Sequence, residues 1–161
     1  MRRVASIALF VALGAGCAST YSDPTRDENA SAPSARLVLR NQNAEVAALR
    51  TFDDAARCLR PLLIPDASLI SAGEEADIGV RAGHDFTVEA RRPGPDACIA
   101  IATFRPEAGK RYLAQFGSTG PVCWLNVVRV DSVVPPKVVP EPSLRARRPS
   151  PEDPQAACAA E

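Results

Sequence analysis

The sequence has few of the side chains that catalytic and metal sites require. Its one histidine is His84, so a histidine-dependent triad must use this residue, and a site with several histidine ligands is excluded. The five cysteines form no C-x-x-C pair, which argues against a thioredoxin-type redox site and a zinc ribbon. Phosphate-binding glycine loops, the dinucleotide fingerprint and the nucleophile elbow of hydrolases are missing as well. We therefore predict that the protein is not an enzyme and has no catalytic residue, metal or cofactor.

The chain also lacks an excess of positive charge. Lysine and arginine together number 19, as do aspartate and glutamate, so the formal net charge is +0. Without a basic excess to neutralise phosphates, nucleic-acid binding is not indicated. Aromatic residues make up only 5% of the chain, which is poor material for the stacking platforms of a glycosidase cleft.

No apolar run is long enough to cross a membrane. The longest one, residues 4–13 with Ser6 as its one polar residue, would form a helix of about 15 Å, half of a hydrocarbon core of about 30 Å. It follows Arg2 and Arg3 and precedes small residues, which is typical of a secretory signal peptide over residues 1–16.

The residues that end this segment resemble a bacterial lipobox. The string Leu13-Gly-Ala-Gly-Cys17 places small residues directly before a cysteine, although Gly14 stands where lipoboxes usually carry a branched aliphatic residue. The resemblance implies that Cys17 becomes the N-terminus and carries a fatty acid such as palmitate, which anchors the protein in the membrane. Ala18 implies sorting to the outer membrane, with the protein facing the periplasm. Two alternatives remain: ordinary secretory cleavage near Gly16, and an uncleaved anchor.

Composition divides the rest of the chain into three parts. Residues 17–34 are polar and are predicted to form a flexible tether. Residues 35–134 hold nearly all branched and aromatic residues and form the predicted domain. Residues 135–161 carry a proline about every fourth position and are predicted to be an irregular tail.

Short alternating runs within the domain favour strands. They are residues 36–40, 76–80, 84–90, 98–104, 111–116 and 122–130. Residues 43–59 are compatible with a helix or with a strand followed by a loop. The predicted fold is mainly β: a small antiparallel β-sandwich of six or seven strands with at most one short helix.

The stretch from Phe104 to Tyr112 contains the pattern F-x-P-x-x-G-x-x-Y between two predicted strands, with a cysteine on either side. It resembles small uncharacterised proteobacterial envelope lipoproteins. The resemblance implies a β-rich domain and no particular activity. Pro106 restricts φ and Gly109 permits positive φ, so we expect a corner across which Phe104 and Tyr112 pack.

Four cysteines remain once Cys17 is assigned to the lipid. An even number in an oxidising compartment predicts two disulfides, with buried free thiols as the alternative. Of the three pairings we favour Cys58–Cys98 with Cys123–Cys158, because it closes the shorter loops. An intrachain bond to Cys158 would pull the tail across the domain as a covering strap.

The remaining candidate residues have ordinary structural interpretations. His84 beside Asp85 is interpreted as a solvent-facing strand residue and not as a catalytic base. Trp124 is predicted to pack in the core against a disulfide. Five carboxylates could in principle supply a glycosidase acid and base or calcium ligands: Asp53, Asp54, Glu74, Glu75 and Asp77. The cluster from Glu74 to Asp77 follows Gly73 and is interpreted as a solvated turn.

The combined prediction is a lipid-anchored cell-envelope protein with a non-catalytic structural or interaction role and an envelope protein as partner. The alternative is a periplasmic ligand-binding or weakly catalytic module that uses its loop carboxylates. A pocket that gathered those carboxylates would favour the alternative.

Overall fold

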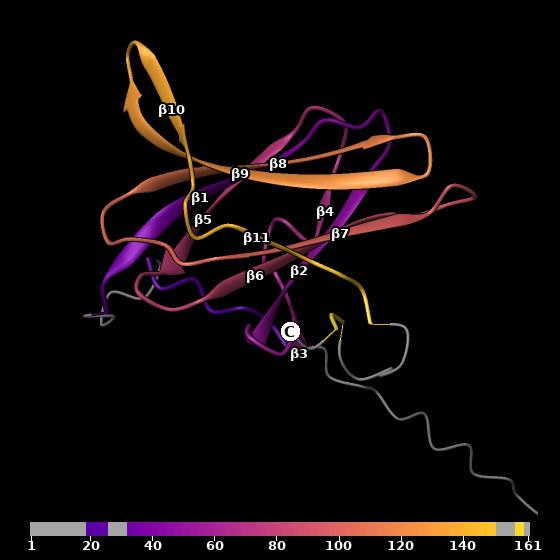
Figure 1. Cartoon of the computed structure of the whole chain (residues 1–161), viewed down its shortest axis with the longest axis horizontal. Coiled ribbons are helices and arrows are strands. Elements are labelled where there is room, and N and C mark those ends of the chain that lie inside the picture. The colour runs from indigo at the N-terminus through magenta and orange to yellow at the C-terminus, as the bar shows by residue number, and fades with distance from the viewer. Residues whose placement is uncertain (1–18, 26–31, 151–156, 160–161) are drawn as a thin grey trace, which may run out of the picture.

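The structure is a computed structural model that describes residues 19–25, 32–150 and 157–159. Within these ranges the chain forms eleven strands and no helix. The prediction of a mainly β fold is confirmed, whereas the expected six or seven strands were too few. Two sheets lie one above the other, and the side chains between them form the core (Figure 1).

The first sheet has five strands. In spatial order they are β10 (Pro136–Pro140), β9 (Val122–Val133), β8 (Arg111–Thr119), β1 (Ser34–Asn41) and β5 (Glu75–Arg81). The second sheet has the order β11 (Arg145–Arg147), β7 (Cys98–Phe104), β6 (Phe86–Arg92), β2 (Ala47–Asp54) and β3 (Leu59–Leu63), and the short β4 (Leu69–Ile70) also pairs with β2.

One strand pair departs from the purely antiparallel arrangement that the sequence predicted. β1 and β8 run parallel, with Arg36 opposite Arg111 and Asn41 opposite Phe116. Parallel neighbours need a long crossover, and here the intervening chain builds much of the second sheet before β8 returns to the first.

Alternation along the strands builds the core. Leu37 and Leu39 of β1, Val88 of β6, and Phe104 and Tyr112 at the corner after β7 are all fully or almost fully buried. The rings of Phe104 and Tyr112 lie 5.1 Å apart between centroids, and Gly109 has a φ of 70°. The predicted corner is therefore confirmed.

Residues 43–59, for which helix and strand both remained open, form β2 followed by a turn. Phe52 lies on one face of β2 and Leu49 on the other, so the two apolar side chains serve different clusters. Since a strand alternates faces, a three-residue spacing of apolar side chains does not require a helix.

The tail prediction needs a correction, because residues 135–161 are not irregular throughout. β10 and β11 form within them and extend the two sheets. Both are edge strands, where the missing N–H of a proline breaks no ladder hydrogen bond on the outer side. β10, with the end of β9, projects beyond the rest of the sandwich (Figure 1).

Candidate interaction surface

A hollow of about 420 Å³ brings together three of the candidate residues, Asp53, His84 and Asp85. They do not form a catalytic pair. The His84 Nδ1 atom lies 3.2 Å from the carbonyl oxygen of Ala82. Asp85 instead accepts hydrogen bonds from Arg105 at 3.0 Å and Arg145 at 2.6 Å.

The electrostatics of Asp85 support this interpretation. Burial alone would raise the pKa of the carboxyl group, but the hydrogen bonds from Arg145 and Arg105 outweigh burial and hold the pKa below its ordinary value. An aspartate held ionised by two guanidinium groups ties β11 to the loop before β6. It is therefore a structural link and not the partner of His84.

The other candidate carboxylates do not gather in one pocket. Asp53 pairs with Arg60 at 2.7 Å, and Asp54 accepts the backbone N–H of Arg57 at 3.1 Å, both on the second sheet. The acidic residues around β5 lie on the first sheet, where Glu74 accepts the N–H of Ser71, Glu75 pairs with Arg40, and Asp77 pairs with Arg36 and Arg111. Each of the five carboxylates is therefore paired with a neighbouring arginine or backbone N–H group.

Trp124 is not in the core, so that prediction was wrong. Its side chain lies on the outer face of the first sheet with 38% of its surface exposed. The opposite residue on β8 is Gly117, and a Cβ atom there would overlap the indole ring. The glycine therefore makes room for the indole to lie flat on the sheet, outside the core.

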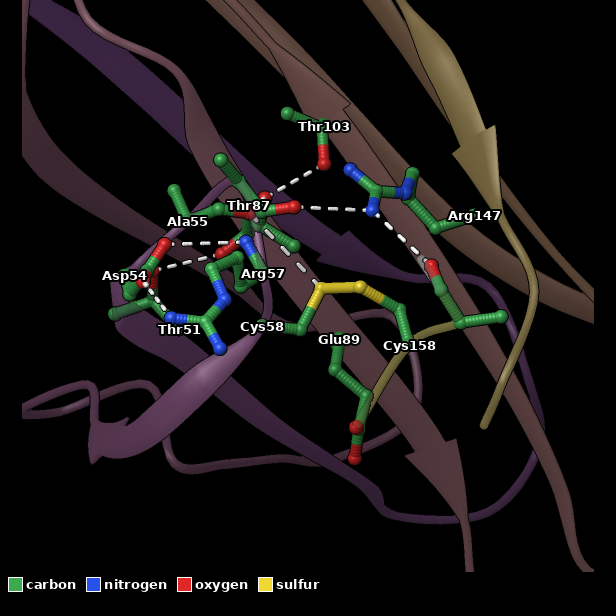
Figure 2. Close-up of a disulfide and its surroundings, with 12 residues drawn as sticks. Thr51, Asp54, Ala55, Arg57, Cys58, Thr87, Glu89, Thr103, Arg147 and Cys158 are labelled. Atoms are coloured by element: carbon green, nitrogen blue, oxygen red, sulfur yellow. Dashed lines mark hydrogen bonds and ion pairs between the residues drawn. A yellow bond between two sulfur atoms is a disulfide. The ribbon is translucent and has the colours of Figure 1, made fainter. Parts of the chain in front are cut away.

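All four cysteines that were assigned to disulfides are bonded, but the pairing differs from the favoured one. Cys98 of β7 bonds to Cys123 of β9 and so joins the two sheets. Cys58 bonds to Cys158, which is 100 residues away in the sequence (Figure 2). The preference for short loops was wrong because the tail returns to the turn after β2.

The disulfide at Cys158 fastens a C-terminal strap, which comprises β11, residues 148–150 and residues 157–159. Arg147 donates hydrogen bonds to the carbonyl oxygens of Ala56 and Ala159 at 3.0 and 3.3 Å. The N–H of Ala157 donates to the carbonyl oxygen of Cys58. In Figure 2 the guanidinium group of Arg147 lies beside the disulfide and points toward the turn after β2. The predicted intrachain bond to Cys158 is confirmed.

The strap continues from β11, at the edge of the second sheet, and its end at Cys158 packs over part of the outer face of that sheet. The covered part is unusually polar for a buried surface. Thr87 and Thr103 are fully buried there, and their hydroxyl groups lie 2.6 Å apart. The Thr87 hydroxyl is also 2.7 Å from the Ala55 carbonyl oxygen. Because buried polar groups must find partners, these hydrogen bonds allow the strap to cover this face.

Residues 19–25 form a docked N-terminal segment, so this part of the predicted flexible tether is in fact attached to the domain. Leu63 donates its N–H to the carbonyl oxygen of Ser19 at 3.0 Å, and Tyr21 donates its N–H to the carbonyl oxygen of Leu63 at 2.8 Å. These bonds extend the edge of the second sheet next to β3. Cys17 itself lies outside the described residues.

The same segment then reaches the edge of the first sheet. Gly79 of β5 donates its N–H to Asp23 at 2.8 Å, and its carbonyl oxygen accepts the hydroxyl of Tyr21 at 2.9 Å. The Tyr21 ring packs edge-on against Phe86. Burial, reinforced by the negative charge of Asp23, raises the pKa of the Tyr21 hydroxyl well above its usual range. The segment therefore covers the unpaired backbone of two edge strands.

A second hollow, of about 410 Å³, lies beside this segment on the uncovered part of the second sheet; we call it the groove. Its lining combines apolar and charged side chains: Ala48, Leu49, Arg50, Leu63, Ser68, Leu69, Glu89 and Arg91. Glu89 is only 2% exposed and pairs with Arg50 at 2.8 Å and with Arg91 at 3.2 Å. The Arg50 Nε atom is buried without a hydrogen-bond partner.

Sequence reasoning missed the groove. Alternation along residues 84–90 places Thr87 and Glu89 together, opposite Phe86 and Val88, and such a polar face is normally solvent-exposed. Glu89 is buried between Arg50 and Arg91, and Arg50 lies 39 residues away in the sequence. The exposed apolar pair Leu63 and Leu69 lies outside the runs for which the sequence predicted strands.

No protein-family model, curated protein or solved structure matches this chain. In the described ranges, no cluster of three or more histidine, cysteine, aspartate or glutamate side chains is arranged to hold a metal ion. Nor do these ranges contain a helix of the length and hydropathy that crossing a bilayer requires.

Proposed function

We propose that the protein is a lipid-anchored cell-envelope protein with a non-catalytic role in binding another envelope component. The signal peptide over residues 1–16 would direct export, and Cys17 would carry the lipid. The two disulfides support an oxidising compartment, since such bonds rarely persist in a reducing cytosol.

The observation that carries the proposal is the use of the cysteines. Four of the five bond to one another within the folded domain, and the fifth is Cys17, directly after the small residues of the lipobox-like string. A cysteine with no cysteine partner in an exported chain would be a reactive thiol. Lipidation gives this residue a role and removes the thiol.

A role in binding is supported by how the polar side chains are used. The candidate carboxylates are committed to arginines or backbone N–H groups, and Asp85 links two segments of the fold. What the domain offers to other molecules is surface: the groove, and on the opposite sheet the exposed Trp124 and Val122. Exposed aromatic and apolar side chains are characteristic of contact surfaces.

The test is the variant Cys17→Ser in cells, with Ser19→Ala as the matched control. We expect Cys17→Ser to abolish labelling with a radioactive fatty acid and to move the protein from the membrane fraction to the soluble fraction. Ser19→Ala leaves the lipidation site intact and should label and fractionate as the wild type does. Undiminished labelling of Cys17→Ser would refute lipidation at this residue.

The binding role is tested separately by crosslinking in intact cells, followed by mass spectrometry of the crosslinked species. We expect one specific envelope component to be crosslinked to the wild type and to Ser19→Ala. The crosslink should be lost when Trp124 or the side chains that line the groove are substituted. Crosslinks that are unaffected by any of these surface substitutions would argue against binding through either surface.

A further inference from the structure

The distance between the proposed lipid and the folded domain is very short. Only Ala18 separates Cys17 from Ser19, whose carbonyl oxygen accepts the N–H of Leu63. Two residues of extended chain span at most about 7 Å. A lipid on Cys17 would therefore hold β3 within reach of the headgroup region, which is only about 5–8 Å thick on each side of the hydrocarbon core.

The surface that this places at the membrane carries two exposed leucines. Leu63 is 45% exposed, and Leu69, which lies in the short strand β4, is 67% exposed. Both β3 and β4 pair with the same edge of β2, Leu63 opposite Arg50 and Leu69 opposite Ala48. The two leucines therefore lie next to each other on the outer face of the second sheet, at the rim of the groove.

The charges of the groove are also suited to a membrane surface. Two arginines, Arg50 and Arg91, face the single carboxylate of Glu89, which leaves one positive charge in excess. In the headgroup region of a bilayer, the phosphate groups of the phospholipids can pair with arginine side chains. Protein segments that lie in this region commonly combine apolar side chains such as leucine with basic ones such as arginine.

We propose that the rim formed by Leu63 and Leu69 contacts the phospholipid bilayer that carries the Cys17 lipid, and that the docked N-terminal segment holds the domain in this orientation. The inference rests on the proposed lipid anchor and adds a fixed orientation to it. The face that carries Trp124 then points away from the membrane, because Trp124 lies on the outer face of the opposite sheet.

The experiment measures tryptophan quenching in the lipidated protein, reconstituted into vesicles of phosphatidylethanolamine and phosphatidylglycerol with brominated acyl chains. The wild type reports on Trp124, its one tryptophan. The variant Leu69→Trp with Trp124→Phe reports on the proposed contact. Since interfacial side chains sit about 5–10 Å into the headgroup boundary, we expect the variant to lose roughly half of its emission and the wild type to lose almost none.

A second substitution tests the part played by the docked segment. A Cβ atom at Gly79 would overlap the side chains of Asp23 and Thr25, so Gly79→Val should release the segment without touching the groove. In the Leu69→Trp background we expect Gly79→Val to abolish most of the quenching, because the released chain becomes a longer spacer. Tyr21→Phe keeps the ring and removes one hydrogen bond, and it serves as the control that retains quenching.

The outcomes separate this inference from the proposed function. Protein without a fatty acid on Cys17 would overturn both. Two results with lipidated protein would overturn the orientation and leave the anchor intact: no quenching of the tryptophan introduced at position 69, or equal quenching of that tryptophan and of Trp124. Full quenching that persists in Gly79→Val would overturn the role of the docked segment.

Discussion

The two ends of the domain both fold back onto it, but they are fastened in different ways. The C-terminal strap is held by a covalent bond between Cys58 and Cys158 and covers part of the outer face of the second sheet. No disulfide among the described residues joins the N-terminal segment to the domain. The segment is held by backbone bonds to Leu63 and by the side chains of Tyr21 and Asp23.

The two attachments cover different parts of the fold. The strap covers Thr87 and Thr103, whose hydroxyl groups find hydrogen-bond partners beneath it, and a disulfide keeps the cover in place. The N-terminal segment covers the unpaired backbone of β3 and β5, which would otherwise invite pairing with another chain. We therefore expect the strap to control global stability and the N-terminal segment to control local opening.

Removal of the strap bond should have the largest effect. The chain-entropy model gives about 4–5 kcal/mol for a disulfide that closes 100 residues, so Cys58→Ser with Cys158→Ser should lower the free energy of unfolding by up to that amount. The measurement is the urea midpoint under oxidising conditions. The control, Cys98→Ser with Cys123→Ser, opens a loop of 25 residues and should lower it by about 3–4 kcal/mol.

Limited proteolysis also tests whether the disulfide fastens the strap. Arg145 is exposed and is followed by Ala146, so trypsin should cut after it in the native protein, whereas the bond after Arg148 is protected by Pro149. The C-terminal fragment should stay attached until reductant is added. Release without reductant would contradict the strap.

Release of the N-terminal segment should have a smaller and more local effect. We expect Gly79→Val to lower the free energy of unfolding by about 1–3 kcal/mol, because the added side chain displaces Asp23 and Thr25. Amide hydrogen exchange should accelerate at Leu63 and at residue 79, whose N–H groups bond to the segment. Unchanged exchange at Leu63 would show that the segment is not fastened as described.

The electrostatic tie between the strap and the loop before β6 can be tested through pH. Asp85 has a lowered pKa, so its ionised form stabilises the folded protein above about pH 4, the ordinary range of the group, and the contribution is lost as the pH falls through the folded pKa. We expect Asp85→Asn to cost about 1 kcal/mol at pH 7. The difference between wild type and variant should vanish in acid, as measured by thermal unfolding from pH 7 to pH 2. A difference that grows in acid would contradict the ion pair.

The smallest effect is expected from Tyr21→Phe. The variant loses the hydrogen bond to the Gly79 carbonyl oxygen and keeps the contact with Phe86, so it should cost about 0.5–1 kcal/mol. The measurement is again the urea midpoint, and a loss as large as that of Gly79→Val would mean that the tyrosine hydroxyl alone holds the segment.

Several strands were predictable because their signal is local. Residues 98–104 were expected from alternation and match β7, and five further runs overlap β1, β5, β6, β8 and β9. The corner from Phe104 to Tyr112 was predictable for the same reason. Pro106 restricts φ, and Gly109, only three residues later, permits the positive φ that the turn needs. β10 was missed because proline argues against strands in general, yet an edge strand tolerates it.

The groove and the fastening of the two ends were not predictable in this way. Alternation shows that Thr87 and Glu89 share a face of β6, but not that a strap arriving from residue 145 onward will cover part of that face. The polar composition of residues 19–25 is typical of a linker, and their attachment depends on the free edges of β3 and β5. Both features arise from contacts between segments about 40 to 100 residues apart in the sequence.

The sequence by itself determined the mainly β fold, the positions of most core strands and the even set of four cysteines in the domain. These follow from the period of two along a strand and from residue chemistry, both of which are local. Only the tertiary structure decided which cysteines bond, which sheet face is buried, and that Leu63 and Leu69 lie beside the start of the domain. Each of these depends on where distant segments meet, and the core that brings them together exists only in the folded chain.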